Sequence, residues 1–412
     1  MTIDAIGEAR KKKILVLVSR GGGGHKTAAM AIQEILGDTY DIEINYVLQD
    51  ILQRADILNI ITRGRFTGED LYNFFLKRHQ KKCLTWMIKQ REKRMTSRTI
   101  ERLFDNYLFH LSHKPDLIIS PTPFINYGIA CATSRYKIPF LIMPTDLDGS
   151  TFLDGFPQET TGLNFMLSLP YDDQQVLETT LQKRVVAAHQ IQIGGFPVRP
   201  ASCHTYTLQQ QKQLRANFHL LDGHKTVTLI MGALGGNLIV DHVRALLRMN
   251  PALHGLAVEI NICTGDNQKV GKKVEKLLHK QGAKEAREGS FVLPSGLVLH
   301  LRGYLPNLIE LMAVSDLLIT KPGSCTVNEA IYLGKKVIVD NTKHSTARCL
   351  PWEAFNISFV EKNGLGSSFT DCRQLPMLVL SLLKFTPTAT DAPIRPCLGS
   401  ALPQIVRSII KN

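Results

Sequence analysis

An apolar strand, a glycine-rich turn and an amphipathic helix occur in this order twice, and this repeat limits the possible folds more than any other feature. Residues 14–18 form a continuous apolar run, residues 21–24 are all glycine, and a helical pattern extends to Leu36. The same order returns over residues 227–247, with residues 232–236 as the glycine-rich turn. Apolar strands that alternate with helices indicate parallel sheets covered on both faces. We therefore predict an α/β protein with two doubly wound Rossmann-like domains.

Short apolar runs continue both series, and 412 residues leave room for two domains of roughly 100–200 residues each. We predict an N-terminal domain over residues 1–200 and a C-terminal domain over 225–385, joined between Pro197 and Lys225. A Pro- and Thr-rich stretch indicates that residues 386–412 are a connector and a C-terminal helix. The expected strands cover residues 14–18, 42–48, 117–119, 140–142, 165–167, 191–193, 227–231, 260–263, 297–301, 317–320 and 337–340.

The composition excludes several classes of protein. A hydrophobic fraction of 44% excludes a disordered chain, and no apolar run reaches the roughly 18–20 residues that cross a bilayer. Eight scattered cysteines form no C-x-x-C pair, so we expect neither a zinc site nor a dense disulfide framework, and a cytoplasmic setting is the simplest interpretation. The net charge of +13 indicates an anionic partner, either nucleic acid, anionic lipid or a phosphorylated substrate.

The first glycine-rich turn places a histidine at the start of a helix. Gly22, Gly23 and Gly24 precede His25, so the Gly that a Walker phosphate loop needs directly before Lys26 is missing. The third Gly of a dinucleotide fingerprint is missing too. What remains is a turn that lets a ligand approach a helix N-terminus, where the helix dipole disfavours the imidazolium. His25 is therefore a candidate general base, and a tight turn with an incidental histidine is the alternative.

The second glycine-rich turn contains Gly232, Gly235, Gly236 and Asn237 before the next helix. Its backbone N–H groups could hold a diphosphate without a metal ion. A plain connection between strand and helix is the alternative.

Residues 320–330 combine a strand end, a Pro-Gly-Ser turn and a helix that we expect to begin near Thr326. Glu329 follows Thr326 by one helical turn, so the pair resembles a capping box. In the other interpretation, the Glu329 carboxylate grips paired hydroxyls, as on a ribose, beside a phosphate-binding turn.

Asp146 and Asp148 follow an expected strand as an Asp-x-Asp pair. Two carboxylates beside a diphosphate suit Mg²⁺ or Mn²⁺, so a metal site of this kind is one interpretation. A three-residue match occurs easily by chance, and the sequence therefore predicts no metal site here.

Most of the excess positive charge lies between Ile61 and Lys114. This segment has 13 Lys and Arg against 5 Asp and Glu, which gives +8 of the total +13. Aromatic residues interleave with these charges, a mixture that suits an anionic membrane surface. A solvated helical face with its aromatic side chains in the core is one alternative, and a nucleic-acid-binding segment is another.

Taken together, the motifs resemble the monogalactosyldiacylglycerol synthase and diacylglycerol glucosyltransferase family. The first matching motif is Ser-Arg-Gly-Gly-Gly-Gly-His-Lys-Thr-Ala, and all of them follow in the order of the family. The matching segments are residues 19–28, 114–120, 145–147, 195–199, 231–236, 263–267, 303–307, 321–330 and 351–356. This family is related to the peptidoglycan lipid-intermediate N-acetylglucosaminyltransferase and has the GT-B fold, in which two Rossmann-like domains face each other across a cleft.

The resemblance implies an inverting transfer of a hexose from a UDP-sugar to a lipid acceptor such as diacylglycerol. It implies that the acceptor side includes Gly22, Gly23 and Gly24, with His25 as the base and Asp146 as a second candidate for the base or for orienting the acceptor. The implied donor-binding residues are Gly232, Gly235, Gly236, Asn237, Tyr304, Leu305, Gly323, Ser324, Thr326, Glu329, Glu353 and Asn356. Among these, Tyr304 and Leu305 would flank the uracil, Glu329 would hold the ribose, and Glu353 and Asn356 would contact the sugar.

We further expect no cofactor and no metal, a cytoplasmic protein peripherally associated with the membrane through the basic segment 61–114, and no nucleic-acid partner. Transfer to a polyprenyl-linked or non-lipid acceptor, and a UDP-sugar epimerase of the same fold, remain as alternatives. A basic nucleic-acid-binding protein is the alternative without enzyme activity.

Overall fold

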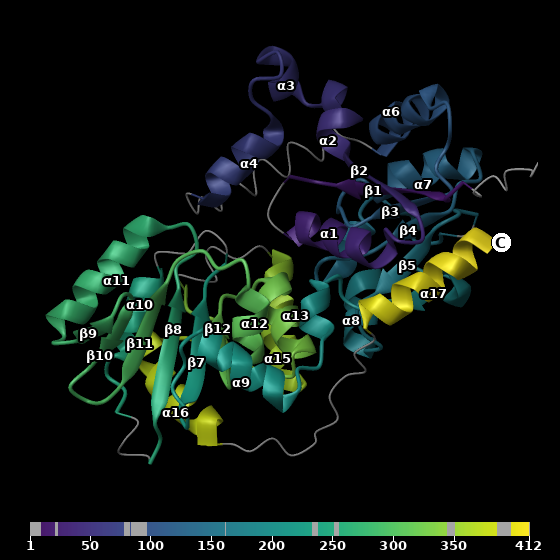
Figure 1. Cartoon of the computed structure of the whole chain (residues 1–412). Coiled ribbons are helices and arrows are strands. Elements are labelled where there is room, and N and C mark those ends of the chain that lie inside the picture. The colour runs from purple at the N-terminus through teal and green to yellow at the C-terminus, as the bar shows by residue number, and fades with distance from the viewer. Residues whose placement is uncertain are drawn as a thin grey trace, which may run out of the picture.

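The chain folds into two sheets surrounded by helices, and the predicted α/β fold class is confirmed (Figure 1). The computed structural model describes residues 10–20, 24–77, 83, 97–160, 162–232, 238–250, 255–343, 351–384 and 397–411.

The N-terminal sheet has six parallel strands in the order β2-β1-β3-β4-β5-β6. Residues 14–18 of β1 are all buried, which explains their uninterrupted apolar sequence. The strands are β1 Lys13–Val18, β2 Asp41–Tyr46, β3 Leu117–Ser120, β4 Phe140–Ile142, β5 Met166–Leu169 and β6 Ile191–Ile193. The helices are α1 Gly24–Leu36, α2 Val47–Asp50, α3 Ile57–Ile61, α4 Gly68–Lys77, α6 Ser97–His110, α7 Asn126–Arg135 and α8 Gln174–Leu181.

The C-terminal sheet has eight strands in the order β14-β13-β12-β7-β8-β11-β10-β9. Strand β10 is antiparallel to both of its neighbours, β9 and β11, and the other pairings in this sheet are parallel. The strands are β7 Lys225–Ile230, β8 Val258–Cys263, β9 Lys284–Arg287, β10 Ser290–Val292, β11 Val298–Arg302, β12 Leu317–Thr320, β13 Lys336–Asp340 and β14 Gly366–Phe369. The helices are α9 Leu208–Asn217, α10 Leu238–Leu246, α11 Gln268–Lys280, α12 Leu308–Ala313, α13 Ser324–Tyr332, α15 Ala354–Lys362 and α16 Leu375–Lys384.

Each sheet has one point at which the order of the strands reverses. The chain runs from β1 outward to β2 and then returns to β3 on the other side of β1; β7 lies in the same way between β8 and β12. In doubly wound folds, ligands bind beyond the carboxyl ends of the strands at such a point. The turns after β1, β3, β7 and β12 are therefore the places to look for a site.

Two local predictions differ from the structure. The strand expected over residues 42–48 ends at Tyr46. Val47 and Leu48 are the first two residues of α2, and their side chains are buried. The helix expected to begin near Thr326 begins at Ser324, directly after the Pro322-Gly323 turn.

The last helix, α17 (Leu398–Lys411), returns to the N-terminal domain. It is the yellow helix next to the C label in Figure 1. Its apolar face packs into the core that contains Ile14 and Val16 of β1. The chain therefore crosses between the domains twice, once before α9 and once before α17. No helix among the described residues is long and apolar enough to span a bilayer.

Candidate active site

His25 lies at the reversal point of the N-terminal sheet, as the second residue of α1. Its Nδ1 atom is 2.7 Å from the carbonyl oxygen of Pro121, which follows β3, and 3.2 Å from the Thr145 hydroxyl. A carbonyl oxygen only accepts, so Nδ1 carries the proton and donates it to Pro121. In the neutral ring the lone pair then lies on Nε2, as a general base requires.

The start of α1 lies close to α13 at Gly24. A Cβ atom on Gly24 would lie 3.1 Å from the Cys325 sulfur, so a larger residue would displace this side chain. Gly22 and Gly23 lie outside the described residues.

Asp146 joins the two domains. Its Oδ1 atom accepts a hydrogen bond of 2.6 Å from the hydroxyl of Ser324, the first residue of α13. Burial raises the pKa of Asp146 to about 7, and the neighbouring Glu353 and Asp148 carboxylates add to this, against the lowering effect of the Ser324 hydrogen bond. The Asp148 carboxylate accepts from the Ser150 backbone N–H and caps the short helical turn that follows. The described residues contain no group of three or more metal-ligating side chains.

Asp146→Asn is expected to stabilise the folded protein at pH 8. In the unfolded chain this carboxyl titrates near 3.8, so the folded state binds more protons between about pH 4 and pH 7, and ionisation of Asp146 destabilises it progressively across that window. Removing the charge should raise the free energy of unfolding at pH 8 by about 1–3 kcal/mol, with a smaller gain at pH 5. Urea unfolding measures this, with the exposed Asp154→Asn as control; an equal or lower stability of Asp146→Asn at pH 8 would contradict it.

Lys321 directly follows β12, and its side chain also lies close to the turn after β7. A Cβ atom on Gly232, whose φ of +84° is left-handed, would lie 3.4 Å from the Lys321 Cε atom. A Cβ atom on Gly323 would lie 3.1 Å from Lys321 Cε and Nζ. The Nζ atom donates to Glu353 Oε1 over 3.0 Å. Lys321 was not among the predicted site residues, although it stands directly before the Pro-Gly-Ser turn.

Glu329, predicted to hold the ribose, is buried and paired with Arg199. The Arg199 guanidinium donates to both carboxylate oxygens, over 2.7 and 2.9 Å. The N-cap of α13 is Gly323, without a side-chain cap, and Thr326 lies inside the helix. The capping-box interpretation of Thr326 and Glu329 is therefore wrong. Because a carboxylate oxygen can accept more than one hydrogen bond, the ribose role of Glu329 stays a prediction.

The other predicted donor residues differ in their exposure to solvent. Asn356 is fully buried, and its amide donates to the Pro322 carbonyl (2.8 Å) and the Ser324 hydroxyl (3.0 Å), so it holds the turn before α13. Tyr304 is exposed beyond β11, whereas Leu305 packs against the core beneath α13. Gly235, Gly236 and Asn237 lie outside the described residues.

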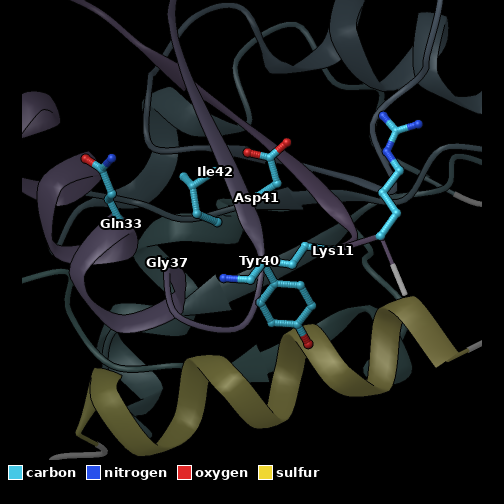
Figure 2. A pocket seen from close by; sticks show the side chains of 7 residues that line it. Lys11, Gln33, Gly37, Tyr40, Asp41 and Ile42 are labelled. Carbon is cyan, nitrogen blue, oxygen red and sulfur yellow. The ribbon is translucent and has the colours of Figure 1, made fainter. Parts of the chain in front are cut away.

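Phe124 is a residue near the site that the sequence analysis missed. Its φ of +68° is strained for an aromatic residue, and its ring meets Trp352 of the C-terminal domain edge-on, with 5.9 Å between the ring centroids. This further contact between the domains comes from the loop after β3, the loop that also provides Pro121. The pocket shown in Figure 2 is separate from the candidate active site. It lies at the C-terminal end of α1, around Gly37 and Tyr40.

Known proteins with sequences similar to this chain are glycosyltransferases. Residues 256–345 match the glycosyltransferase family 28 C-terminal domain. The whole chain is 25% identical to 72% of monogalactosyldiacylglycerol synthase 1 from Arabidopsis thaliana, and 80% of the chain is 23% identical to 76% of a processive diacylglycerol beta-glucosyltransferase from Bacillus cytotoxicus. The chain is similar in sequence to these glycosyltransferases. The predicted family resemblance and the hexosyltransferase class are confirmed.

Solved structures share the fold at low sequence identity. MurG from Acinetobacter baumannii has a TM-score of 0.54 at 13% identity, over 97% of this chain and all of that one. A putative UDP-N-acetylglucosamine 2-epimerase from Listeria monocytogenes has a TM-score of 0.55 at 12% identity, over 97% of this chain and 96% of that one. The predicted GT-B fold is confirmed.

Proposed function

We propose that this hexosyltransferase transfers a hexose from a UDP-sugar to a hydroxyl of a lipid acceptor such as diacylglycerol, with inversion, at a membrane surface. The observation that carries the proposal is the hydrogen bond between Asp146 and Ser324. It holds the loop after β4, in which the Thr145 hydroxyl contacts His25, against the start of α13, next to Lys321. A candidate base and a cation for a leaving diphosphate are thus provided by the two domains on either side of this contact.

In the proposed reaction His25 Nε2 takes the proton of the acceptor hydroxyl. The acceptor oxygen bonds to the anomeric carbon from one face, while the bond to the diphosphate oxygen breaks on the other, and UDP leaves with the electron pair. Lys321 and the N-terminus of α13 stabilise the charge that develops on the diphosphate. These groups provide the stabilisation that a metal ion provides in other transferases, so we expect no metal requirement.

Incubation with UDP-glucose or UDP-galactose and diacylglycerol vesicles, followed by mass spectrometry of the lipids, tests the proposal. We expect a monohexosyl lipid. Hexose on a polyprenyl or soluble acceptor alone would favour the alternative acceptors, and conversion of the UDP-sugar without any acceptor would favour an epimerase. A salt-dependent shift with RNA or DNA and no UDP binding would favour a nucleic-acid-binding protein.

We assign the membrane contact to the hairpin of α3 and α4. Ile60 and Ile61 are 56% and 72% exposed, and Phe66 and Phe74 are also exposed large apolar side chains. Arg54, Arg63 and Arg65 belong to the same stretch of chain and are exposed, which suits a surface of anionic headgroups above acyl chains. Within the basic segment 61–114, Phe104 is core, and residues 78–82 and 84–96 lie outside the described residues.

The protein is expected to sediment with anionic vesicles more than with neutral ones, and less so at high salt. The double variant Ile60→Ser/Ile61→Ser should reduce binding by about tenfold or more, because burial of one isoleucine contributes roughly 1.5–3 kcal/mol. Leu208→Ser, at an exposed apolar position on α9 of the C-terminal domain, is the control. Equal binding to anionic and neutral vesicles, or equal binding of the double variant and the wild type, would contradict the assignment of the membrane contact to the hairpin of α3 and α4.

A further inference from the structure

Two aromatic side chains from different domains meet beside the candidate active site. Phe124 lies in the loop after β3, and Trp352 lies in the short helical turn Pro351–Glu353. Their rings are in edge-on contact, with 5.9 Å between the centroids. Both side chains are only partly buried, so each ring keeps a surface that a ligand can reach. Ligand sites in proteins are lined mainly by apolar and aromatic side chains of this kind.

Hydrogen bonds fix the loop that carries Phe124. The Thr122 hydroxyl donates to a backbone carbonyl of β1 over 2.9 Å, and the buried Asn126 amide donates to the Phe152 carbonyl over 2.9 Å. The Phe124 N–H itself donates to the Thr151 carbonyl over 2.9 Å. These bonds hold Phe124 at a φ of +68°, a conformation that is unfavourable for an aromatic residue. Backbone strain of this kind is concentrated at ligand-binding and catalytic sites, which indicates a role for the ring.

The neighbours of Trp352 hold it beside the turn that precedes α13. Glu353 directly follows Trp352, and its Oε1 atom accepts from Lys321 Nζ over 3.0 Å. Asn356, three residues further along the chain, donates to the Pro322 carbonyl over 2.8 Å. Trp352 is therefore attached to the same turn as the candidate cation for the diphosphate.

The two rings are near both the candidate base and this cation. Pro121, whose carbonyl accepts from His25 Nδ1, precedes Phe124 by three residues, which span at most about 11 Å. On the other domain, Trp352 is adjacent in the chain to the carboxylate partner of Lys321. The rings thus add an apolar surface to a site whose other groups are polar. An acceptor with acyl chains needs such a surface near its hydroxyl, because its apolar part must also leave water when it binds.

We infer that Phe124 and Trp352 form a subsite for the apolar part of the acceptor, made of the glycerol esters and the first methylene groups of the acyl chains. The inference rests on the proposed function and assigns to it a subsite to which both domains contribute. The rings select an acceptor with acyl chains over a soluble hydroxyl compound, and they place its hydroxyl near His25.

Phe124→Ala and Trp352→Ala test this subsite with a soluble short-chain diacylglycerol, so that contact with a membrane plays no part. Each variant should raise the KM for this acceptor by about tenfold or more, because an aromatic ring provides a large apolar contact area. The KM for the UDP-sugar should stay within about twofold of the wild type, because the rings bind the acceptor only. Trp352→Phe keeps an aromatic ring and should lose less.

Tyr171→Phe controls for a weaker contact between the domains. The buried Tyr171 hydroxyl, which follows β5, donates to the Asn328 carbonyl oxygen of α13 over 2.7 Å. Loss of this bond should leave the KM for diacylglycerol within about twofold of the wild type, because the rings remain. An unchanged KM for diacylglycerol in the ring variants would overturn the inference. An equal rise of both KM values in these variants, or the same rise in Tyr171→Phe, would overturn it too, because the rings would then only hold the domains together.

The fluorescence of Trp352 tests the subsite separately from the transfer reaction. The chain has two tryptophans, so Trp86→Phe leaves Trp352 as the only one. In this variant, short-chain diacylglycerol should lower the quenching of Trp352 by acrylamide by about twofold or more, because a bound ligand covers the ring. Glycerol, which has no acyl chains, should not, and additional replacement of Phe124 by alanine should weaken the protection.

The two outcomes of this experiment separate the subsite from the proposed function. Protection of Trp352 by diacylglycerol without transfer of a hexose to any acceptor would overturn the proposed function and leave the subsite standing. Transfer to diacylglycerol without protection, or protection by the UDP-sugar alone, would overturn the subsite and leave the proposed function standing.

Discussion

Replacement of His25 by alanine is expected to lower transfer by about 10²–10⁴-fold, the usual contribution of a general base. The Pro121 carbonyl fixes the proton on Nδ1, so Nε2 is the atom that would take the proton of the acceptor hydroxyl. UDP-sugar binding should change by less than about twofold, because the predicted donor groups lie on the other domain. Turnover assays at saturating UDP-sugar measure the rate of transfer, and calorimetry measures the affinity for the UDP-sugar.

His189→Ala is the matched control, because this histidine is exposed in the same domain and far along the chain from the reversal point. It should retain full turnover. Turnover in His25→Ala comparable to that of the wild type would show that another group is the base, and Asp146 would then be the next candidate.

Lys321→Met is expected to lower kcat by about 10²–10³-fold, similar to the loss of one oxyanion-stabilising donor. In the structure the Lys321 ammonium pairs with Glu353, and it lies beside the positions of Gly232 and Gly323 that the diphosphate should approach. A diphosphate would compete with Glu353 for this cation and could leave the carboxylate to accept sugar hydroxyls. Lys321→Arg keeps the charge and should lose less.

Lys225→Met controls for the loss of a lysine–carboxylate pair. Lys225 pairs with Asp316 over 3.1 Å at the opposite end of β7 from Gly232, and its side chain is 46% exposed, close to the 43% of Lys321. This variant should transfer at the wild-type rate. Equal rates for Lys321→Met and Lys225→Met would remove Lys321 from the diphosphate site.

The fold was predictable because its main determinants are local. Most of the buried parallel strands are short apolar runs, and a glycine-rich turn follows both β1 and β7, so the two strand–turn–helix units were evident in the sequence. Strand β14 was missed, because Gly-Ser-Ser-Phe is not an apolar run. The hairpin of β9 and β10 was missed because all four residues of β9 are exposed and three of them are charged, which leaves no apolar alternation to detect. The amphipathic pattern of α17 predicted a helix, but not its return to the first domain.

The candidate site was only partly predictable, because its contacts join distant parts of the chain. The motifs selected His25, Asp146 and Ser324, yet the Asp146–Ser324 hydrogen bond spans 178 positions. The pairing of Glu329 with Arg199 spans 130, and only the fold brings them together. A local pattern suggested a helix cap for Glu329, and the tertiary ion pair formed instead. Neither periodicity nor spacing identifies such partners.

Release of UDP from UDP-glucose and UDP-galactose, measured with and without diacylglycerol vesicles, tests the central claim most directly. The account predicts rapid release with one or both donors when diacylglycerol is present and little release with vesicles that lack it. UDP release that does not depend on diacylglycerol, or no release from either donor, would contradict the transfer of a hexose to this lipid.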